Sequence, residues 1–305
     1  MKPSVLLLFF IRFLRKILRA VITLEKRVAN SAYRGSQDRV GIIQSTLKHD
    51  MVALADEQHY QEQYWYWILA CLNANNSPPD GTYLDLGCGQ GRLTLPLAKW
   101  CATGKVVGVD FSSRAIDRAK GYALKAGLSN IEYYAQDMLV FLQSKKSNSF
   151  DGAMFIEVVF FMPEYQPILQ EIQRVLKPKG LLFASFRPQY FYALHGVNNR
   201  VFDDVDTVLR NRVGGLGGQS THFTWQTSGE IKHLMESELQ FELLELYGIG
   251  CCSGIEGDPH EGIARPSLLD GDERKKLMEV EIAMARSIPD AGRYILSVAR
   301  KKDAR

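Results

Sequence analysis

The stretch Tyr83-Leu-Asp-Leu-Gly-Cys-Gly-Gln-Gly-Arg92 decides the fold. An apolar run leads directly into glycines at positions 87, 89 and 91, and a helical pattern of apolar residues follows at once. This order predicts a buried strand, a tight turn and the N-terminus of a helix. Because glycine has no Cβ, a ligand can lie against the backbone N–H groups at the start of that helix. The spacing differs from that of a dinucleotide site, which would place a glycine where Arg92 stands.

Further segments of strand length follow this motif along the chain. They lie at residues 105–110, 131–137, 150–156 and 181–186, and helical spacing recurs between them, most clearly at 112–126 and 168–176. This alternation predicts a doubly wound α/β fold whose binding site lies along the carboxyl ends of its parallel strands. The expected remainder is a helix at 227–238, a strand at 241–247 and an antiparallel strand at 293–299. Together these elements predict a seven-stranded, mostly parallel sheet.

The sequence Asp85-Leu-Gly-Cys-Gly-Gln-Gly91 resembles motif I of the class I S-adenosylmethionine-dependent methyltransferases. The segment Leu176-Lys-Pro-Lys-Gly180 is similar to the L-K-P-G-G turn of the same family. Together with the order of the strands, the specific part of the resemblance covers about residues 80–187. It implies a Rossmann-like fold, S-adenosyl-L-methionine as cofactor and S-adenosyl-L-homocysteine as product.

The resemblance also implies roles for single residues. Asp85 would help to hold the methionine amino group of the cofactor, and the three glycines would line its methionine and ribose. Asp110 would accept from the ribose hydroxyls, which also fits an acid about 20 positions beyond a glycine loop. Asp137 would accept from the adenine amino group, although a solvated strand end is an alternative interpretation. The expected cofactor-binding residues are Asp85, Gly87, Gly89, Gly91, Asp110, Phe111, Asp137, Met138, Glu157 and Tyr64.

The chain departs from one branch of that family at the end of the fourth strand. Methyltransferases that act on quinone precursors carry E-x-x-E-H, an apolar residue and Pro there, whereas this chain has Glu157-Val-Val-Phe-Phe-Met-Pro163. Phe160 and Phe161 replace the family's Glu and His, so a more apolar acceptor site is expected. Core packing of at least one of the two rings is the alternative.

Residues 187–228 are expected to form a substrate lid, because aromatic residues there surround a glycine run at 214–218. If the acceptor must lose a proton, the candidate bases are Glu157, His195 and His222. His222 is the first choice, since imidazole titrates near neutrality and residues 221–225 alternate polar and apolar side chains. An ordinary surface or core histidine is the alternative for His222.

Composition predicts one catalytic domain with additions, because 305 residues with 46% hydrophobic side chains can bury a substantial core. The five cysteines form neither a C-x-x-C pair nor a Cys/His cluster, so we expect no metal site, no disulfide framework and a cytoplasmic location. The expected segments are a basic amphipathic helix at 1–30, a helical cap and linker at 31–79, the cofactor-binding core at 80–186, the lid at 187–228, and the rest of the core at 229–300 with an insertion at 248–292.

The N-terminal segment is strongly basic. Residues 1–28 carry seven basic side chains against Glu25, while the whole chain has a net charge of +3. The basic and apolar residues fall on opposite faces at helical spacing, and the apolar run is too short to span a bilayer. Such a helix suits an anionic membrane surface or a groove on a partner. Packing on the protein's own core and contact within a homodimer are the alternatives. The acidic remainder of the chain argues against nucleic-acid binding.

The predicted function is transfer of a methyl group from S-adenosyl-L-methionine to a small, hydrophobic acceptor, with oxygen, nitrogen and carbon all open as the methylated atom. The protein would mainly align the two reactants and exclude water, because the cofactor brings the reactivity. Two alternatives stay open. One is a peptide or protein methyltransferase, which should show an open acidic groove, and the other is a non-catalytic, membrane-recruited module that binds S-adenosylmethionine.

Overall fold

The structure is a computed structural model that describes residues 49–162, 164–216, 223–255 and 264–303. The predicted N-terminal helix at 1–30 and the candidate base His222 therefore lie outside the described residues.

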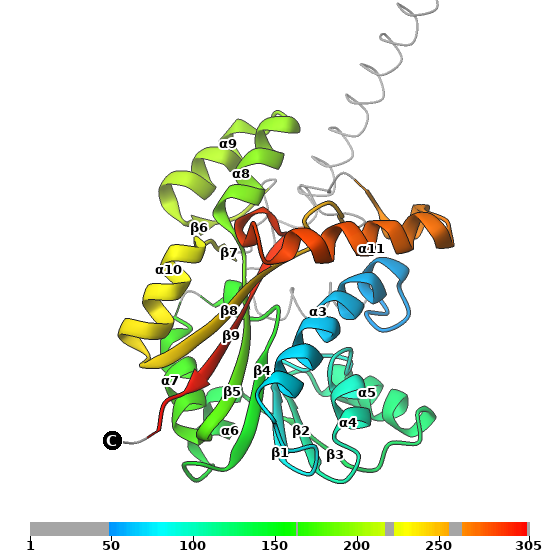
Figure 1. Ribbon diagram of the computed structural model, residues 1–305, viewed down its shortest axis with the longest axis vertical. Coiled ribbons are helices and arrows are strands. Elements are labelled where there is room, and N and C mark those ends of the chain that lie inside the picture. The colour runs from blue at the N-terminus through cyan, green and yellow to red at the C-terminus, as the bar shows by residue number, and fades with distance from the viewer. Residues whose placement is uncertain (1–48, 163, 217–222, 256–263, 304–305) are drawn as a thin grey trace, which may run out of the picture.

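A seven-stranded sheet with the order β3-β2-β1-β4-β5-β9-β8 runs through the molecule (Figure 1). The pairs among the first five strands are all parallel, whereas β9 is antiparallel to both β5 and β8. This arrangement confirms the predicted doubly wound, mostly parallel sheet and its antiparallel strand. The strands are β1 (Thr82–Leu86), β2 (Lys105–Asp110), β3 (Ile131–Ala135), β4 (Phe150–Phe155), β5 (Leu176–Phe186), β8 (Phe241–Ile249) and β9 (Tyr294–Lys301).

Helices cover both faces of the sheet because each buries an apolar side against it. One hydrophobic cluster joins the sheet to α3 (Ala55–Ala74) and α4 (Thr94–Trp100). A second joins the other face to α6 (Met138–Gln143), α7 (Gln166–Val175) and α10 (Ser228–His233), and α10 continues as a π-helical turn, Leu234–Glu238. The remaining core helix, α5 (Ser113–Lys125), packs on β2 and β3 and begins at the capping residue Ser112.

The segment 176–180, predicted as a turn after a helix, lies inside β5 as an irregularity. Leu176 pairs with Phe150 and Leu181 pairs with Gly152, so the intervening residues of β5 bulge out of register. Lys179 adopts a φ of 64°, in the left-handed region that a turn requires. The residues turn as expected, but the strand pairing continues on both sides of them.

The region after β5 is built mainly of short helices in its described part. It contains α8 (Gln189–Asn198), α9 (Phe202–Asp206), a π-helical turn at Thr207–Asn211 and a small hairpin of β6 (Val213–Gly214) and β7 (Phe223–Thr224). The predicted glycine-hinged lid thus has more regular structure than its sequence suggested. The predicted insertion between β8 and β9 holds α11 (Gly271–Ala285), which Asp270 caps.

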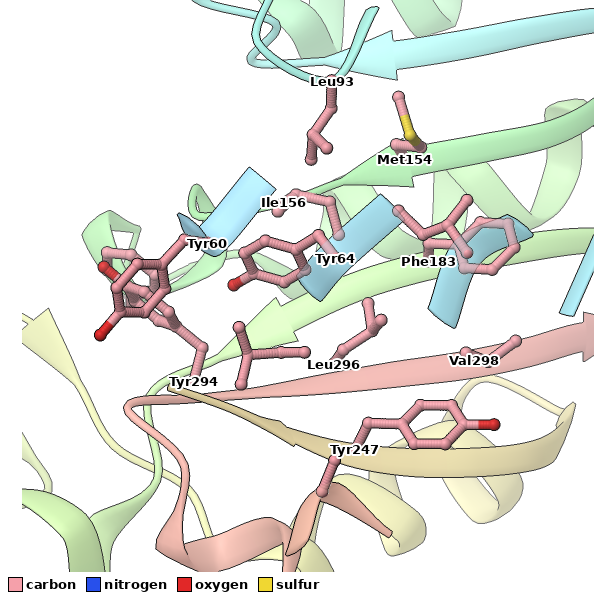
Figure 2. Packing of buried hydrophobic residues seen from close by; sticks show 14 of the residues in the cluster. Tyr60, Tyr64, Leu93, Met154, Ile156, Phe183, Tyr247, Tyr294, Leu296 and Val298 are labelled. Carbon is pink, nitrogen blue, oxygen red and sulfur yellow. The ribbon is translucent and has the colours of Figure 1, made fainter. Parts of the chain in front are cut away.

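A buried carboxylate fastens α3 to α11. Glu281 is fully buried, and its oxygens lie 2.7 Å from His59 Nε2 and 2.5 Å from the Gln63 amide nitrogen, which donates to it. The Cys252 N–H and the Ser253 hydroxyl also donate to Glu281, at 2.7 and 2.9 Å. Because each oxygen is hydrogen-bonded, the network can hold α3 in one position over the sheet edge. Figure 2 shows Tyr60 and Tyr64 of α3 beside Ile156, Tyr294 and Leu296.

None of the helices in the described ranges is long and apolar enough to span a bilayer.

Candidate cofactor and acceptor site

All three glycines of the loop after β1 have a positive φ. Gly87, Gly89 and Gly91 have φ values of 72°, 52° and 92°, a region that other residues rarely adopt. A Cβ on Gly87 would lie 2.3 Å from a methyl carbon of Val158, so the loop is also packed tightly against the segment after β4. No described atom lies within 4 Å of a Cβ placed on Gly89. The backbone is therefore open to a ligand at Gly89.

Two carboxylates flank this loop on neighbouring strands. Asp110, at the end of β2, accepts the Gly89 N–H at 3.0 Å and the Ser112 N–H at 2.9 Å. Asp85, in β1, accepts the Thr94 hydroxyl at 2.5 Å. Burial raises the pKa of Asp85 to about 7, and it also raises the pKa of Asp110. Both carboxylates are held in fixed orientations, and a nearby positive charge would stabilise their ionised forms.

Arg92 is a largely buried cation at the far end of the loop, with 11% of its side chain exposed. Its guanidinium contacts Glu57 of α3, and its Nη2 atom lies 2.7 Å from Glu157 Oε1. Burial alone would lower the pKa of Arg92, but the two carboxylates hold it above its usual range. Burial raises the pKa of Glu57 to about 7 although Arg92 opposes the shift. One arginine thus connects α3, the glycine loop and the end of β4.

Glu157 stands in a strained conformation just beyond β4. Its φ is 58°, which costs a non-glycine residue roughly 1–3 kcal/mol. Its N–H donates to the Ser185 hydroxyl of β5 at 2.6 Å, so neighbouring strand ends hold it in place. Since strain of this kind persists only where the surroundings enforce it, Glu157 is a candidate functional residue on structural grounds as well.

The other predicted cofactor contacts lie near the ends of β2 and β3 or on α3. Phe111 follows Asp110 and is 48% exposed, and Met138 is half-buried at the start of α6. Asp137 caps α6 by accepting the N–H groups of Leu139 and Val140, at 2.9 and 3.2 Å. Tyr64 is fully buried on α3, and the nearby Glu157 carboxylate adds to the effect of burial in raising its pKa. These roles toward a cofactor stay predictions.

The residues expected on the acceptor side come from three different elements. Phe160 lies in the 3₁₀ turn Val159–Phe161, is buried, and stacks on Tyr294 with ring centroids 5.5 Å apart. Phe161 is half-buried, and its centroid lies 5.5 Å from that of Phe223 in β7. His195 is half-buried on α8, with its ring 4.2 Å from that of Phe191. Glu157 is therefore placed at the strand ends, while His195 belongs to the region after β5.

Sequence reasoning missed the residues whose partners are far away along the chain. The ion pairs of Arg92 join residues 35 and 65 positions apart, and His59 and Glu281 are 222 positions apart. The only local signal for Arg92 was its position, where a dinucleotide-binding loop would have a glycine. Arg187, the first residue after β5, was missed for the same reason, since its three aromatic neighbours come from separate elements.

Comparison with known proteins places this site in a recognisable domain. Residues 78–225 match a family model described as a methyltransferase domain. A sterol 24-C-methyltransferase of Gibberella zeae is 38% identical over 99 residues, which cover 32% of this chain and 25% of that protein. A ubiquinone biosynthesis O-methyltransferase of Coxiella burnetii is 38% identical over 102 residues, covering 33% of this chain and 42% of that protein. The chain thus spans less than half the length of these curated relatives.

Solved structures show the same fold at low identity. An S-adenosylmethionine-dependent methyltransferase of Methanosarcina mazei superposes with a TM-score of 0.52 at 20% identity, over 76% of this chain and 98% of that one. Magnesium protoporphyrin IX methyltransferase of Synechocystis PCC 6803, solved with bound S-adenosylhomocysteine, has a TM-score of 0.50 at 15% identity, over 81% of this chain and 85% of that one. At these identities the likeness concerns the fold alone.

The buried carboxylate of Asp85 predicts that the free energy of unfolding falls as pH rises from about 4 to 7. Asp85 has a pKa of about 7 in the folded protein and an ordinary value near 4 when unfolded. Between those values the folded state binds more protons, so its stability is greatest below the unfolded pKa and is lost as pH rises through 7. Asp85→Asn should reduce the slope by up to about 1.4 kcal/mol per pH unit in urea denaturation. Asp117→Asn, an exposed control, should leave the slope unchanged. An Asp85→Asn slope equal to that of the wild type would contradict this assignment.

Proposed function

Because residues 78–225 belong to the methyltransferase-domain family, as the sequence predicted, we propose that the chain transfers the methyl group of S-adenosyl-L-methionine to a small, hydrophobic acceptor. The proposal rests on the loop at Gly89, whose backbone is open to a ligand. Asp110 accepts the Gly89 N–H, and the two residues lie at the ends of adjacent parallel strands. Two curated relatives are named for carbon methylation of a sterol and oxygen methylation in ubiquinone biosynthesis, so the proposal specifies the acceptor class and not the atom.

The residues around the loop suit this cofactor. When bound, it supplies a methyl group on a positively charged sulfur. Asp110 retains acceptor capacity for two ribose hydroxyls after accepting its two backbone N–H groups. Asp85 would pair with the methionine ammonium group, which would compensate its buried charge. The exposed ring of Phe111 would cover the adenine, together with Met138.

The acceptor side is apolar. The rings of Phe160, Phe161 and Phe223 lie close together beyond the ends of β4 and β5, and they favour a hydrophobic molecule over an extended peptide. We assign residues 187–228 as the lid that would shield the reaction from water. Glu157, His195 and His222 are the residues proposed to receive a proton where the acceptor must lose one. A protein methyltransferase and a silent binding module are the alternatives that activity measurements would separate.

We extend the proposal to the N-terminal segment on the strength of its sequence. The seven basic residues within 1–28 and their interleaved apolar residues would recruit a cytoplasmic enzyme to an anionic membrane, where hydrophobic acceptors are concentrated. A homodimer contact through the same segment is the alternative.

Removing the Asp110 carboxylate should weaken cofactor binding. Asp110→Ala loses the charged acceptor for the ribose hydroxyls, which costs about 2 kcal/mol and lowers affinity roughly 30-fold. Isothermal titration with S-adenosylhomocysteine measures this, with Asp117→Ala on α5 as the control. Wild-type affinity in Asp110→Ala, or binding of NAD in place of S-adenosylhomocysteine, would reject the cofactor assignment.

A histidine base predicts a selective loss of turnover. If His222 accepts the proton, His222→Ala should lower turnover about 10²-fold or more while cofactor affinity stays unchanged. Release of S-adenosylhomocysteine in the presence of hydrophobic acceptors provides the assay. Glu157→Gln and His195→Ala test the other candidates, and His233→Ala, whose side chain is exposed on α10, is the matched control. Turnover close to that of the wild type in His222→Ala would reject His222 as the base.

Deleting residues 1–28 should release the protein from phosphatidylserine vesicles without changing its affinity for S-adenosylhomocysteine. The electrostatic and apolar attractions to the membrane would both be removed with the segment. Co-sedimentation measures the bound fraction. Continued sedimentation of the shortened protein with vesicles, or its failure to fold, would show that the segment has another role.

A further inference from the structure

Arg187 is a buried cation on the acceptor side of the sheet edge. It directly follows β5, is 7% exposed, and has its guanidinium carbon 3.9 Å from the ring centroid of Phe223. The centroids of Phe160 and Tyr192 lie 4.4 and 5.1 Å from the same carbon. Three aromatic rings from three separate elements therefore enclose one guanidinium group.

This guanidinium has no anionic partner in the described part of the chain. No carboxylate there forms an ion pair with Arg187, and its enclosed Nε atom has no hydrogen-bond acceptor. Ring faces attract a cation, but they leave the five N–H donors of an arginine without oxygen acceptors. Arg92 provides the contrast within the same protein, since it is also buried but contacts two carboxylates. A buried guanidinium left unpaired is costly, and a ligand anion would remove that cost.

Arg187 lies on the side of the site expected to bind the acceptor, away from the residues expected to bind the ribose. Ser185, two residues earlier, accepts the N–H of Glu157, so the ends of β4 and β5 meet beside Arg187. Phe160 packs on Tyr294. Burial and Glu157 raise the pKa of Tyr294, and the positive charges of Arg293 and, to a smaller extent, Arg187 oppose that rise. Asp85 and Asp110 belong to β1 and β2, on the other side of β4 in the sheet.

We propose that Arg187 binds a carboxylate of the methyl acceptor, which is therefore a hydrophobic acid whose apolar part lies against Phe160, Phe161 and Phe223. The inference rests on the proposed function and adds the acceptor's charge. The planar guanidinium fork matches the two oxygens of a carboxylate. A single unpaired cation suits a monoanion better than a phosphate monoester. The carboxylate is the anchor and not the methylated group, because oxygens bound to a guanidinium are poor nucleophiles.

Matched acids and amides test the anchor. Dodecanoate and 2-naphthoate, with dodecanamide and 2-naphthamide, are titrated into the full chain saturated with S-adenosylhomocysteine at pH 8. The wild type should bind at least one acid about 10-fold or more tightly than its amide, as expected for a charged hydrogen-bonded pair. Arg187→Met should abolish this preference and Arg187→Lys should keep part of it. Arg286→Met, which removes an exposed arginine beside the Tyr247 ring, should change nothing.

Separate measurements distinguish failure of the proposed function from failure of the carboxylate anchor. Failure of the wild type to bind S-adenosylhomocysteine would reject the proposed function. With that binding intact, three results would each overturn the carboxylate anchor: equal affinities for acids and amides, a preference that survives Arg187→Met, or no binding of either acid. The wild-type comparison and Arg187→Lys decide the matter if Arg187→Met does not fold.

Discussion

The rest of the site depends on the buried ion pairs of Arg92. Glu57 comes from α3, Arg92 from the end of the glycine loop and Glu157 from the end of β4, and no two of these elements are neighbours in the sequence. Removing one partner of such a group would leave an uncompensated buried charge, a loss of roughly 3–5 kcal/mol. The ion pairs therefore fix α3 over the carboxyl edge of the sheet, and the network around Glu281 secures the same helix at α11.

The sheet edge that α3 covers has two parts that differ in their charged residues. Buried carboxylates gather at β1 and β2, where Asp85 and Asp110 would meet the ammonium and ribose of the cofactor. Beyond β4 the surroundings become aromatic, and the guanidinium of Arg187 lies among the rings of Phe160 and Phe223. A low local dielectric strengthens each of these interactions, so the two reactants would be sorted by charge and held in fixed positions. Alignment of this kind is the main contribution that a methyl-transfer enzyme of this class needs from its protein.

The local sequence was sufficient to predict the fold, because each feature that indicates the fold lies within a short segment of the chain. Glycine spacing, strand-end acids and alternating apolar segments predicted the sheet, and the structure places β2 at the predicted residues. Pairings between distant residues were not predictable in this way, since nothing near Arg92 indicates Glu57 and nothing near His59 indicates Glu281. The aromatic and glycine content of the region after β5 predicts a glycine-hinged lid, yet helices occupy much of its described part, because that content alone does not reveal short helices.

A crystal structure of the protein with S-adenosylhomocysteine is the most direct test of this cofactor site. We expect ribose hydroxyls within hydrogen-bond distance of Asp110, the ammonium group beside Asp85, and the sulfur facing Phe160 at the ends of β4 and β5. A ligand bound away from the Gly87–Gly91 loop, or one whose sulfur faces β3, would show that the site is assigned wrongly.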